Sequence, residues 1–404
     1  MKILQLCNKV PYPEKDGGAI GISVFTKALL KAGNEVKMLA MNTSKHFVKI
    51  DSIPKKFKND IKLETVFLDT SLKPLKAIIA LLSGQSYNIS RFRSNAFESK
   101  LIELLKKETF DIIQLEGLYL TPYIKTIRAH SKATIVLREN NVEWLIWERL
   151  AKEEKNFIKK RYLRILSQQL KKYEESILPL CDGIITFTLT DKQRLLDMGC
   201  KIPIRHIPFG IDLEEYKSTR NEKNNALFYI GALDWLPNIH GLDWFLKCVW
   251  PKIHAEYPKL EFHVAGRNMP EKYKSANIPG AVFHGEIENA LQFMNSYSIM
   301  VIPLFAGSGV RVKIIEGMAL TKAIITTDIG IEGIECNYGN DVMIANTPEE
   351  FHTFIKQCID IPASTQIIAT NAKNYVQGHH NISIITNNLI GFYKELTSIN
   401  IQAN

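Results

Sequence analysis

Short apolar runs alternate with amphipathic stretches along almost the whole chain. Residues 2–10 form the first apolar run, and the stretch after Gly17 and Gly18 places its apolar side chains on one helical face until Gly33 ends it. Residues 35–41 form the next apolar run. A strand, a helix and a second strand in this order predict a parallel pair of strands.

The alternation continues to about residue 207 and then restarts after a short segment that contains Pro208 and Gly210, as an interdomain hinge does. Two blocks of alternating strands and helices predict two doubly wound α/β domains, over residues 1–208 and 209–381. A last helix, over about 382–404, has no strand after it and can close either domain. Further strands are predicted over 63–68, 111–115, 134–138, 183–188, 204–207, 226–231, 260–266, 299–303 and 323–327.

A strand, a glycine turn and a helix start follow one another around Gly307 and Gly309. The glycines let backbone N–H groups turn toward a ligand, and a helix N-terminus adds partial positive charge. Arg311 and Lys313 put two full positive charges at this end, where acidic side chains are usual, and Glu316 stands three residues after Lys313 on the same face. The pattern predicts a diphosphate beside the cations and ribose hydroxyls beside the carboxylate. A basic helix start without a ligand is the alternative.

Other candidate ligand contacts lie directly after predicted strands. They are Gly17 and Gly18, Gly231, Arg267, and the turn His284-Gly285-Glu286. Ligands bind open α/β sheets at this edge, so two facing domains predict a cleft between their edges. For each residue alone, an ordinary turn or a surface arginine is the competing interpretation.

Composition narrows the class of protein. The 404 residues are 46% hydrophobic and 23% charged, as in soluble globular proteins, and the net charge of +9 favours an anionic partner. No dinucleotide-binding glycine motif, P-loop or nucleic-acid-binding motif is present, so no nucleic acid is expected. The six cysteines are scattered, which predicts reduced thiols of a cytosolic protein and no zinc site. The apolar runs are too short for a signal peptide or a membrane span.

A long predicted helix over residues 148–176 departs from the rhythm of the two domains. Between Lys152 and Lys172, eight basic residues accompany its apolar stripe. The stripe consists of Leu150, Phe157, Leu163, Leu166 and Leu170. A basic amphipathic helix can lie on an anionic membrane. A packed helix with a solvated face is the alternative that the interspersed glutamates favour.

These motifs resemble those of the retaining nucleotide-sugar glycosyltransferases of family 4, which have the GT-B architecture of two facing Rossmann-like domains. The resemblance covers nearly the whole chain and is strongest over residues 207–212, 229–238, 262–267 and 307–319. In particular, residues 307–316 are similar to the signature loop GxGxRxKxxE of one branch of the family.

The resemblance implies roles for individual residues. Arg311 and Lys313 bind the diphosphate with help from the amides of Gly309 and Val310, and Glu316 accepts from the ribose hydroxyls. The turn after Gly285 holds the base, largely through the backbone of Ile287. Gly17 and Gly18 approach the donor from the first domain, onto which the final helix packs back. Glu116 and Glu143 face the acceptor.

Two positions depart from the family pattern. Ser308 stands where many members have a glutamate, which leaves one contact to the donor sugar unassigned. Asn140 stands where relatives often carry a histidine that reaches the donor sugar at the reacting centre. Asparagine keeps hydrogen bonding but cannot titrate near neutral pH, which makes a changed donor or a weakened enzyme an expectation.

The resemblance implies a cytoplasmic glycosyltransferase, peripheral at the inner membrane face, that acts in surface polysaccharide biosynthesis. It would transfer a sugar from a nucleoside-diphosphate sugar to a hydroxyl of a glycan or lipid-linked acceptor, with retention. Arg311 and Lys313 would stabilise the leaving diphosphate, and no Asp-x-Asp motif follows a strand in the right place, so neither a metal nor another cofactor is expected. The alternatives are a GT-B epimerase and a nucleotide-sugar-binding GT-B protein without transferase activity.

Overall fold

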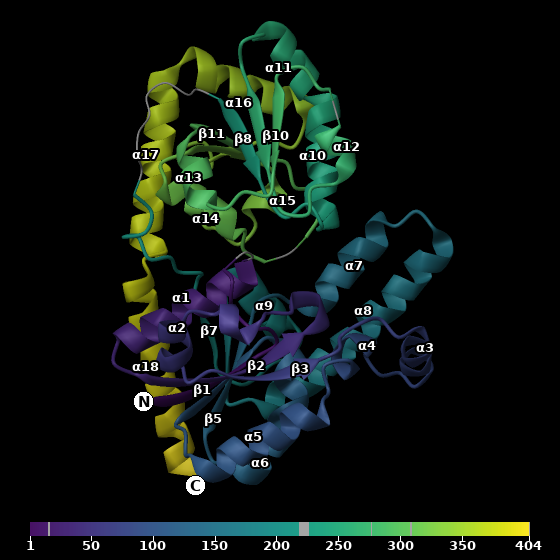
Figure 1. The fold of residues 1–404 in the computed structure, drawn as a ribbon, viewed down its shortest axis with the longest axis vertical. Coiled ribbons are helices and arrows are strands. Elements are labelled where there is room, and N and C mark those ends of the chain that lie inside the picture. The colour runs from purple at the N-terminus through teal and green to yellow at the C-terminus, as the bar shows by residue number, and fades with distance from the viewer. Residues whose placement is uncertain (15–16, 218–225, 276, 308, 404) are drawn as a thin grey trace. The chain divides into compact units, whose positions relative to one another are not determined.

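Two compact units make up the computed structural model, which describes residues 1–14, 17–217, 226–275, 277–307 and 309–403 (Figure 1). Unit 1 comprises Met1–Gly210 and Ile382–Asn404, and unit 2 comprises Ile211–Asn381. The division after Gly210 lies two residues beyond the boundary at residue 208 predicted from the sequence.

Unit 1 is built on a seven-stranded parallel sheet of order β3-β2-β1-β4-β5-β6-β7. Its strands are β1 (Lys2–Cys7), β2 (Glu35–Thr43), β3 (Glu64–Leu68), β4 (Ile112–Glu116), β5 (Thr134–Glu139), β6 (Gly183–Thr186) and β7 (Ile204–His206). The central strands β1, β4 and β5 are almost entirely buried, because helices cover both faces of a parallel sheet. Strand order reverses between β1 and β4, and ligands of such sheets bind at the carboxyl ends of strands at this point.

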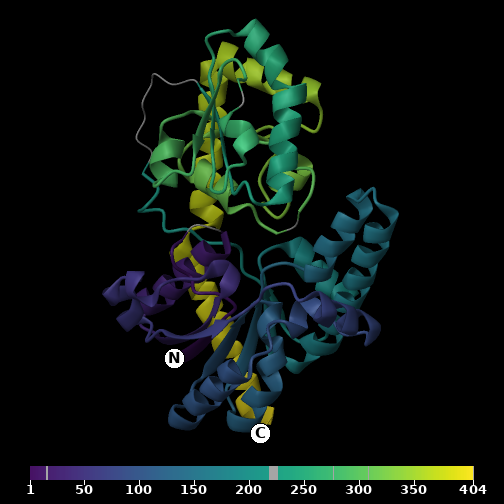
Figure 2. The ribbon, with the colours of Figure 1, turned by 45° about the vertical axis from the view of Figure 1, so that its right-hand side comes forward.

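The helices of unit 1 are α1 (Gly17–Lys31), α2 (Lys55–Asp60), α3 (Pro74–Leu82), α4 (Tyr87–Ser90), α5 (Asn95–Lys107), α6 (Ile124–His130), α7 (Glu143–Glu153), α8 (Phe157–Ile177), α9 (Leu189–Asp197) and α18 (Ile382–Ala403). Short 3-10 helices span Ser44–His46, Ile50–Ser52, Leu118–Tyr123 and Leu178–Leu180. Figure 2 shows the C-terminal helix α18, in yellow, running along the sheet of unit 1. It packs so closely that a Cβ added to Gly183 would lie 2.4 Å from a methyl group of Leu396.

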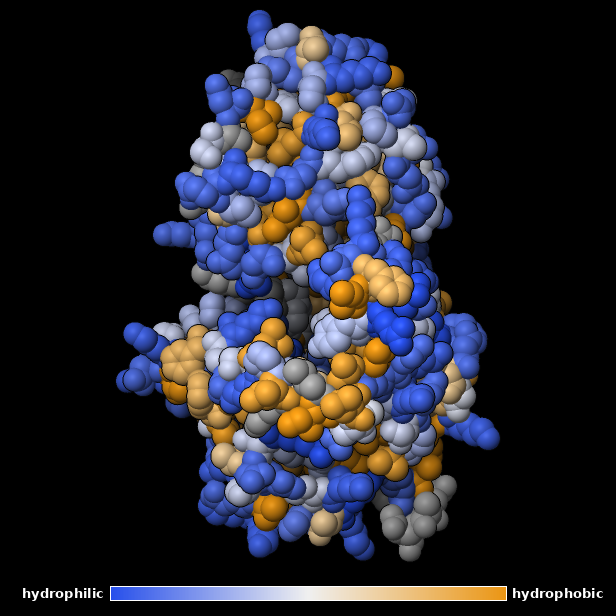
Figure 3. Space-filling model, turned by 90° about the vertical axis from the view of Figure 1, so that its right-hand side faces the viewer, coloured by the Kyte–Doolittle hydropathy of each residue, from blue (hydrophilic) through white to orange (hydrophobic). Residues whose placement is uncertain are grey.

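The prediction of one helix over residues 148–176 is wrong, because two antiparallel helices, α7 and α8, occupy this region. The side chain of Asn156 accepts a hydrogen bond from the amide of Lys159 and starts α8 afresh. Leu163, Leu166 and Leu170 of the predicted stripe are buried, which supports the packed-helix alternative for this part of α8. Figure 3 shows the face of the molecule on which α3 and the tip of the α7–α8 hairpin lie, with apolar side chains in orange on both.

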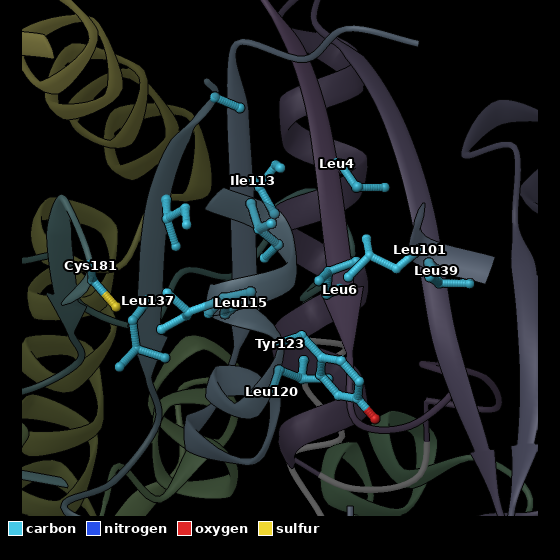
Figure 4. Close-up of a cluster of buried hydrophobic side chains, with 14 of the residues drawn as sticks. Leu4, Leu6, Leu39, Leu101, Ile113, Leu115, Leu120, Tyr123, Leu137 and Cys181 are labelled. Carbon is cyan, nitrogen blue, oxygen red and sulfur yellow. The ribbon is translucent and has the colours of Figure 1, made fainter. Parts of the chain in front are cut away.

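Leucine and isoleucine side chains from β1, β2, β4 and β5 fill one side of the unit 1 sheet (Figure 4). The residues labelled there are Leu4, Leu6, Leu39, Leu101, Ile113, Leu115, Leu120, Tyr123, Leu137 and Cys181. Strand neighbours such as Leu4 and Ile113 are in register, so their side chains stack in layers.

Unit 2 repeats this architecture on a six-stranded parallel sheet of order β10-β9-β8-β11-β12-β13. Its strands are β8 (Leu227–Ile230), β9 (Phe262–Ala265), β10 (Ala281–Gly285), β11 (Ile299–Ile302), β12 (Ala323–Thr326) and β13 (Met343–Ile344). Its helices are α10 (Leu236–Cys248), α11 (Trp250–Glu256), α12 (Glu271–Lys274), α13 (Ala290–Asn295), α14 (Val312–Ala319), α15 (Asp328–Ile331), α16 (Pro348–Asp360) and α17 (Pro362–His379). The predicted α/β class with two doubly wound domains is therefore confirmed. Among the described residues, no helix is long and apolar enough to span a bilayer.

Candidate functional site

Arg311 occupies the N-cap position of α14 and is 6% exposed. Its guanidinium donates to the carbonyl oxygens of Gly309 and, at 3.5 Å, of Ile329. The cation also lies 5.9 Å from the ring centroid of Trp235. A Cβ at Gly307, whose φ is +119°, would lie 2.8 Å from this ring, so the loop requires glycine there. The guanidinium is thus fixed at a helix start, with an aromatic ring beside it.

Lys313 extends from the first turn of α14 to the carboxyl end of β8. Its ammonium group donates to the carbonyl oxygen of Ile230 at 3.1 Å and to the amide oxygen of Asn238 at 3.3 Å. It lies 4.7 Å from the ring centroid of Tyr229. Burial of the ammonium group and the nearby charge of Arg311 lower the pKa of Lys313 to about 7. A bound anion would stabilise the protonated, charged form of Lys313.

Gly231, the residue directly after β8, makes room for this lysine. A Cβ at this position would lie 3.0 Å from the Nζ of Lys313, 2.9 Å from the hydroxyl of Tyr229 and 3.1 Å from the amide nitrogen of Asn238. Contacts this short force neighbouring atoms to move. The absence of a side chain at Gly231 therefore leaves space for the ammonium group of Lys313.

Glu316 lies one turn further along α14, and Tyr216 donates to its Oε1 at 2.9 Å. Burial raises the pKa of Glu316. The Oε1 atom of Glu316 thus has a donor from the protein. Tyr216 was not predicted, because it lies 100 residues earlier in the chain and no local pattern links it to the helix.

Arg267 follows β9 and pairs with Asp234 in the loop after β8, with 3.6 Å between Nε and the carboxylate oxygen. Its side chain is 25% exposed, so the pair is reached by solvent and contributes little to stability. The amide of Leu233 donates to the carbonyl oxygen of Arg267 at 3.0 Å. The loops after β8 and β9 are thereby joined at one edge of the sheet.

The turn after β10 lies at the same edge. Gly285 has a φ of +70°, and its carbonyl oxygen accepts from the amide of Gly266 at 2.8 Å. Ile287 follows in the loop and is partly buried. The preceding His284 contacts His263 at 3.0 Å between ring nitrogens, which anchors the turn to β9.

The glycine loop lies directly before α14, as the sequence predicted. Gly309 has a φ of +79° and is buried, and Val310 is partly buried. Ser308 lies outside the described residues. Unit 2 therefore brings the loops after β8, β9, β10 and β11 to one sheet edge.

In unit 1, Asn140 lies directly after β5 and is partly buried. A Cβ on Gly117, which follows β4, would lie 3.7 Å from the amide nitrogen of Asn140 and 3.9 Å from that of Asn8. Two side-chain amides therefore flank Gly117 at the point where strand order reverses. Asn8 was not predicted, although its place directly after β1 could have indicated it. Gly17 and Gly18 form the first two residues of α1, and both are exposed.

The expectation that Glu116 faces an acceptor is wrong. Glu116 is 0% exposed, and its Oε1 lies 3.3 Å from the Nη1 of Arg138, which is 1% exposed. Gln114 donates to the same oxygen. The carboxylate ends a strand that is covered on both faces, so it belongs to a buried ion pair of the fold.

Glu143 begins α7 and is partly buried. Tyr119 donates to its Oε2 at 2.8 Å, and burial raises the pKa of Glu143 to about 7. The carboxylate of Glu174 on α8 accepts from the backbone amides of Glu143 at 3.0 Å and Trp144 at 3.3 Å. Burial, together with the charge of Glu143, raises the pKa of Glu174 to about 8. Glu174 and Tyr119 were not predicted, and together they fix the orientation of Glu143.

Comparison with known proteins relates this geometry to a family. Residues 224–360 match the model of the family described as glycosyl transferases group 1. The chain is 25% identical over 393 residues to an uncharacterized 44.6 kDa protein in the cps region of Klebsiella pneumoniae, with 94% of this chain and 96% of that protein covered.

Solved glycosyltransferase structures share the fold over nearly the whole chain. Sucrose-phosphate synthase from Thermosynechococcus elongatus aligns with a TM-score of 0.71 at 15% identity, covering 99% of this chain and 100% of that one. Anabaena HepE, solved with UDP-glucose, aligns with a TM-score of 0.66 at 12% identity, covering 98% and 100%. The pneumococcal O-GlcNAc transferase GtfA, solved with UDP and GlcNAc, aligns with a TM-score of 0.66 at 12% identity, covering 98% and 99%. Residues 224–360, which hold Arg311, Lys313 and Glu316, are therefore similar to the glycosyl transferases group 1 family, within a chain that has the GT-B fold.

Proposed function

We propose that this protein is a retaining glycosyltransferase that transfers a sugar from a nucleoside-diphosphate sugar to an acceptor hydroxyl. The observation that supports this most is the group of Arg311, Lys313 and Glu316 at the start of α14, beside the loop after β8. The crystal structures of HepE with UDP-glucose and of GtfA with UDP and GlcNAc, which share the fold, support a nucleotide-sugar donor.

The cations would act on the leaving group. Negative charge builds up on the diphosphate as the bond to the sugar breaks, and fixed positive groups stabilise that charge most when they need not reorganise. Arg311 and Lys313 are already held by protein carbonyl groups, and the amides of Gly309 and Val310 stand at the same helix start. Glu316 would accept from the ribose hydroxyls. Retention would follow from attack on the face that the diphosphate leaves, with Asn140 as a hydrogen-bonding group at the sugar.

The acceptor would be a growing surface polysaccharide or a lipid-linked glycan. The Klebsiella relative lies in a cps region, which supports polysaccharide biosynthesis as the process. The residues of unit 1 that would meet the acceptor are Glu143 and Asn8, whose side-chain amide lies near Gly117.

Thermal melting with UDP, GDP and ADP, each with and without EDTA, tests the donor site. A ligand that binds only the folded protein raises the melting temperature. We expect one diphosphate to do so, and the shift to survive EDTA because the cations take the place of a metal. The sugars of that nucleotide are then screened for release of diphosphate, and the anomeric configuration of the product is read by NMR. Binding without transfer would indicate a nucleotide-sugar-binding protein, and an altered free sugar without acceptor would indicate an epimerase.

Diphosphate affinity is expected to fall as the pH rises from 7 to 9. Because the pKa of Lys313 is lowered to about 7, its charged fraction decreases above that pH, and binding must then take up a proton. Linkage predicts a loss of up to about tenfold per pH unit. Isothermal titration calorimetry with the diphosphate that raises the melting temperature measures this dependence. Lys313→Met should bind more weakly and show a flatter profile, and equal slopes for both proteins would exclude Lys313 as the titrating group.

A further inference from the structure

Unit 1 exposes a set of large apolar side chains that the proposed donor site does not use. On α3, Leu75 is 77% exposed, Ile79 is 64% exposed and Leu82 is 82% exposed. Their spacing of four and three residues places them on one face of the helix. Leu72, just before the helix, is 74% exposed. A helix of a soluble domain normally turns such a face toward the core, and an exposed apolar face of this kind is typical of an interaction site.

A second apolar group lies at the tip of the α7–α8 hairpin. Phe157 and Ile158, the first two residues of α8, are 75% and 79% exposed. The side chain of Gln169 on α8 donates to the carbonyl oxygen of Leu81 at 3.0 Å, which ties α3 to the same helix. Both groups lie on the face drawn in Figure 3, where orange side chains over α3 and at the hairpin tip have blue side chains around them. We call the two groups together the α3–α8 apolar surface.

The charges near this surface are mainly positive. Between Lys152 and Ser176 the chain carries eight basic and four acidic residues. Lys155, Lys159, Arg161 and Arg164 are exposed on the first half of α8, next to the apolar tip. Lys159 forms an ion pair with Glu154 at 2.5 Å, so the net charge there is smaller than the number of cations. An apolar surface with a basic rim is complementary to a layer that is anionic outside and apolar beneath.

We propose that the α3–α8 apolar surface binds an anionic lipid bilayer, with the side chains of α3 and the start of α8 inserted at the level of the headgroups. A second copy of this chain fits less well, because a two-fold contact through this surface would bring two basic rims together. The proposal concerns residues of unit 1 alone and does not depend on sugar transfer. It also differs from the membrane contact considered from the sequence, because the buried stripe residues Leu163, Leu166 and Leu170 take no part.

Co-sedimentation of the full chain with vesicles tests this. The wild-type protein is expected to bind vesicles of phosphatidylcholine with about a third phosphatidylglycerol, to bind pure phosphatidylcholine much more weakly, and to lose affinity as salt is added. Replacing Leu75, Ile79 and Leu82 with glutamine should reduce binding by about 100-fold or more, since three large apolar side chains would no longer be removed from water by the bilayer. Arg161→Gln with Arg164→Gln should weaken binding to the anionic vesicles and leave the weak binding to phosphatidylcholine unchanged.

A control variant removes three exposed isoleucine side chains that lie outside the α3–α8 apolar surface. Ile361, Ile367 and Ile384 are 52%, 61% and 50% exposed, and their replacement with glutamine should leave vesicle binding unchanged. The melting temperature and diphosphate binding of each variant show that it is folded, and they report separately on the proposed function. Wild-type protein that stays in the supernatant with anionic vesicles would overturn the proposal. So would an α3 variant that binds like wild type, or a wild-type protein whose α3 residues instead mediate self-association in analytical ultracentrifugation.

Discussion

Replacing Arg311 with alanine is expected to abolish the rise in melting temperature that a nucleoside diphosphate produces in the wild-type protein. Arg311 is 6% exposed, and its guanidinium is held at the start of α14, so its charge is fixed where the diphosphate is proposed to bind. A hydrogen bond to a charged group is worth on the order of 1.5–3 kcal/mol, and the guanidinium can make two to a diphosphate. Affinity measured by calorimetry should therefore fall by about 100-fold or more.

Stability without ligand separates this effect from damage to the fold. A cation at a helix start is disfavoured by the helix dipole, so its removal offsets part of the loss of the hydrogen bonds to Gly309 and Ile329. The unliganded variant should therefore melt close to the wild type. Lys247→Ala, which removes an exposed cation from α10 of the same unit, should keep the full ligand response. If Arg311→Ala responds to the diphosphate as the wild type does, the proposed donor site is wrong.

The placement of the residues proposed for the donor site could be predicted from the sequence because their signals are local. Gly309, Arg311, Lys313 and Glu316 fall within eight residues, and each has a reason to be at a strand–turn–helix junction. The parallel sheets were equally visible, since apolar runs of strand length alternate with helical periodicity. The partners of these residues could not be predicted in the same way. Tyr216 meets Glu316 across 100 residues, and only the folded chain brings them together.

Unit 1 was harder to predict for two physical reasons. The helical spacing of apolar residues continues from α7 into α8, so the sequence pattern indicated one helix. The N-cap that starts α8 is the single residue Asn156, which is a weak signal in a sequence. Glu116 stands at the end of an apolar strand, where a ligand-binding carboxylate is often found. In the structure it pairs with Arg138, which lies 22 residues later on the neighbouring strand. Whether the side chain at a strand end is buried or open to a ligand depends on which elements cover that face of the sheet. A local sequence pattern does not contain that information.

Arg138→Met is expected to destabilise unit 1 by about 3–5 kcal/mol at pH 8, because it leaves the buried carboxylate of Glu116 without its cation. Methionine is apolar and long enough to fill the space between the rings of Phe25 and Phe187, which lie 4.3 Å and 5.0 Å from the guanidinium carbon. The uncompensated charge therefore dominates the effect. Hydrogen exchange of the β4 and β5 amides measures the loss of unfolding free energy within unit 1, independently of the stability of unit 2.

The pH dependence of this loss has a definite sign. Burial raises the pKa of Glu116 above its ordinary value of 4.5, while the charge of Arg138 and, to a smaller extent, the hydrogen bond from Gln114 lower it. Without Arg138, the carboxyl group should therefore hold its proton to a still higher pH. A folded state that keeps a proton which the unfolded chain releases loses stability as the pH rises. The variant should therefore be closer to the wild type at pH 5.5 than at pH 8. Adding Glu116→Gln, which leaves a neutral group beside Gln114, should restore most of the stability at pH 8. A double variant as unstable as Arg138→Met at both pH values would mean that packing against the two phenylalanines, and not the ion pair, is what Arg138 contributes.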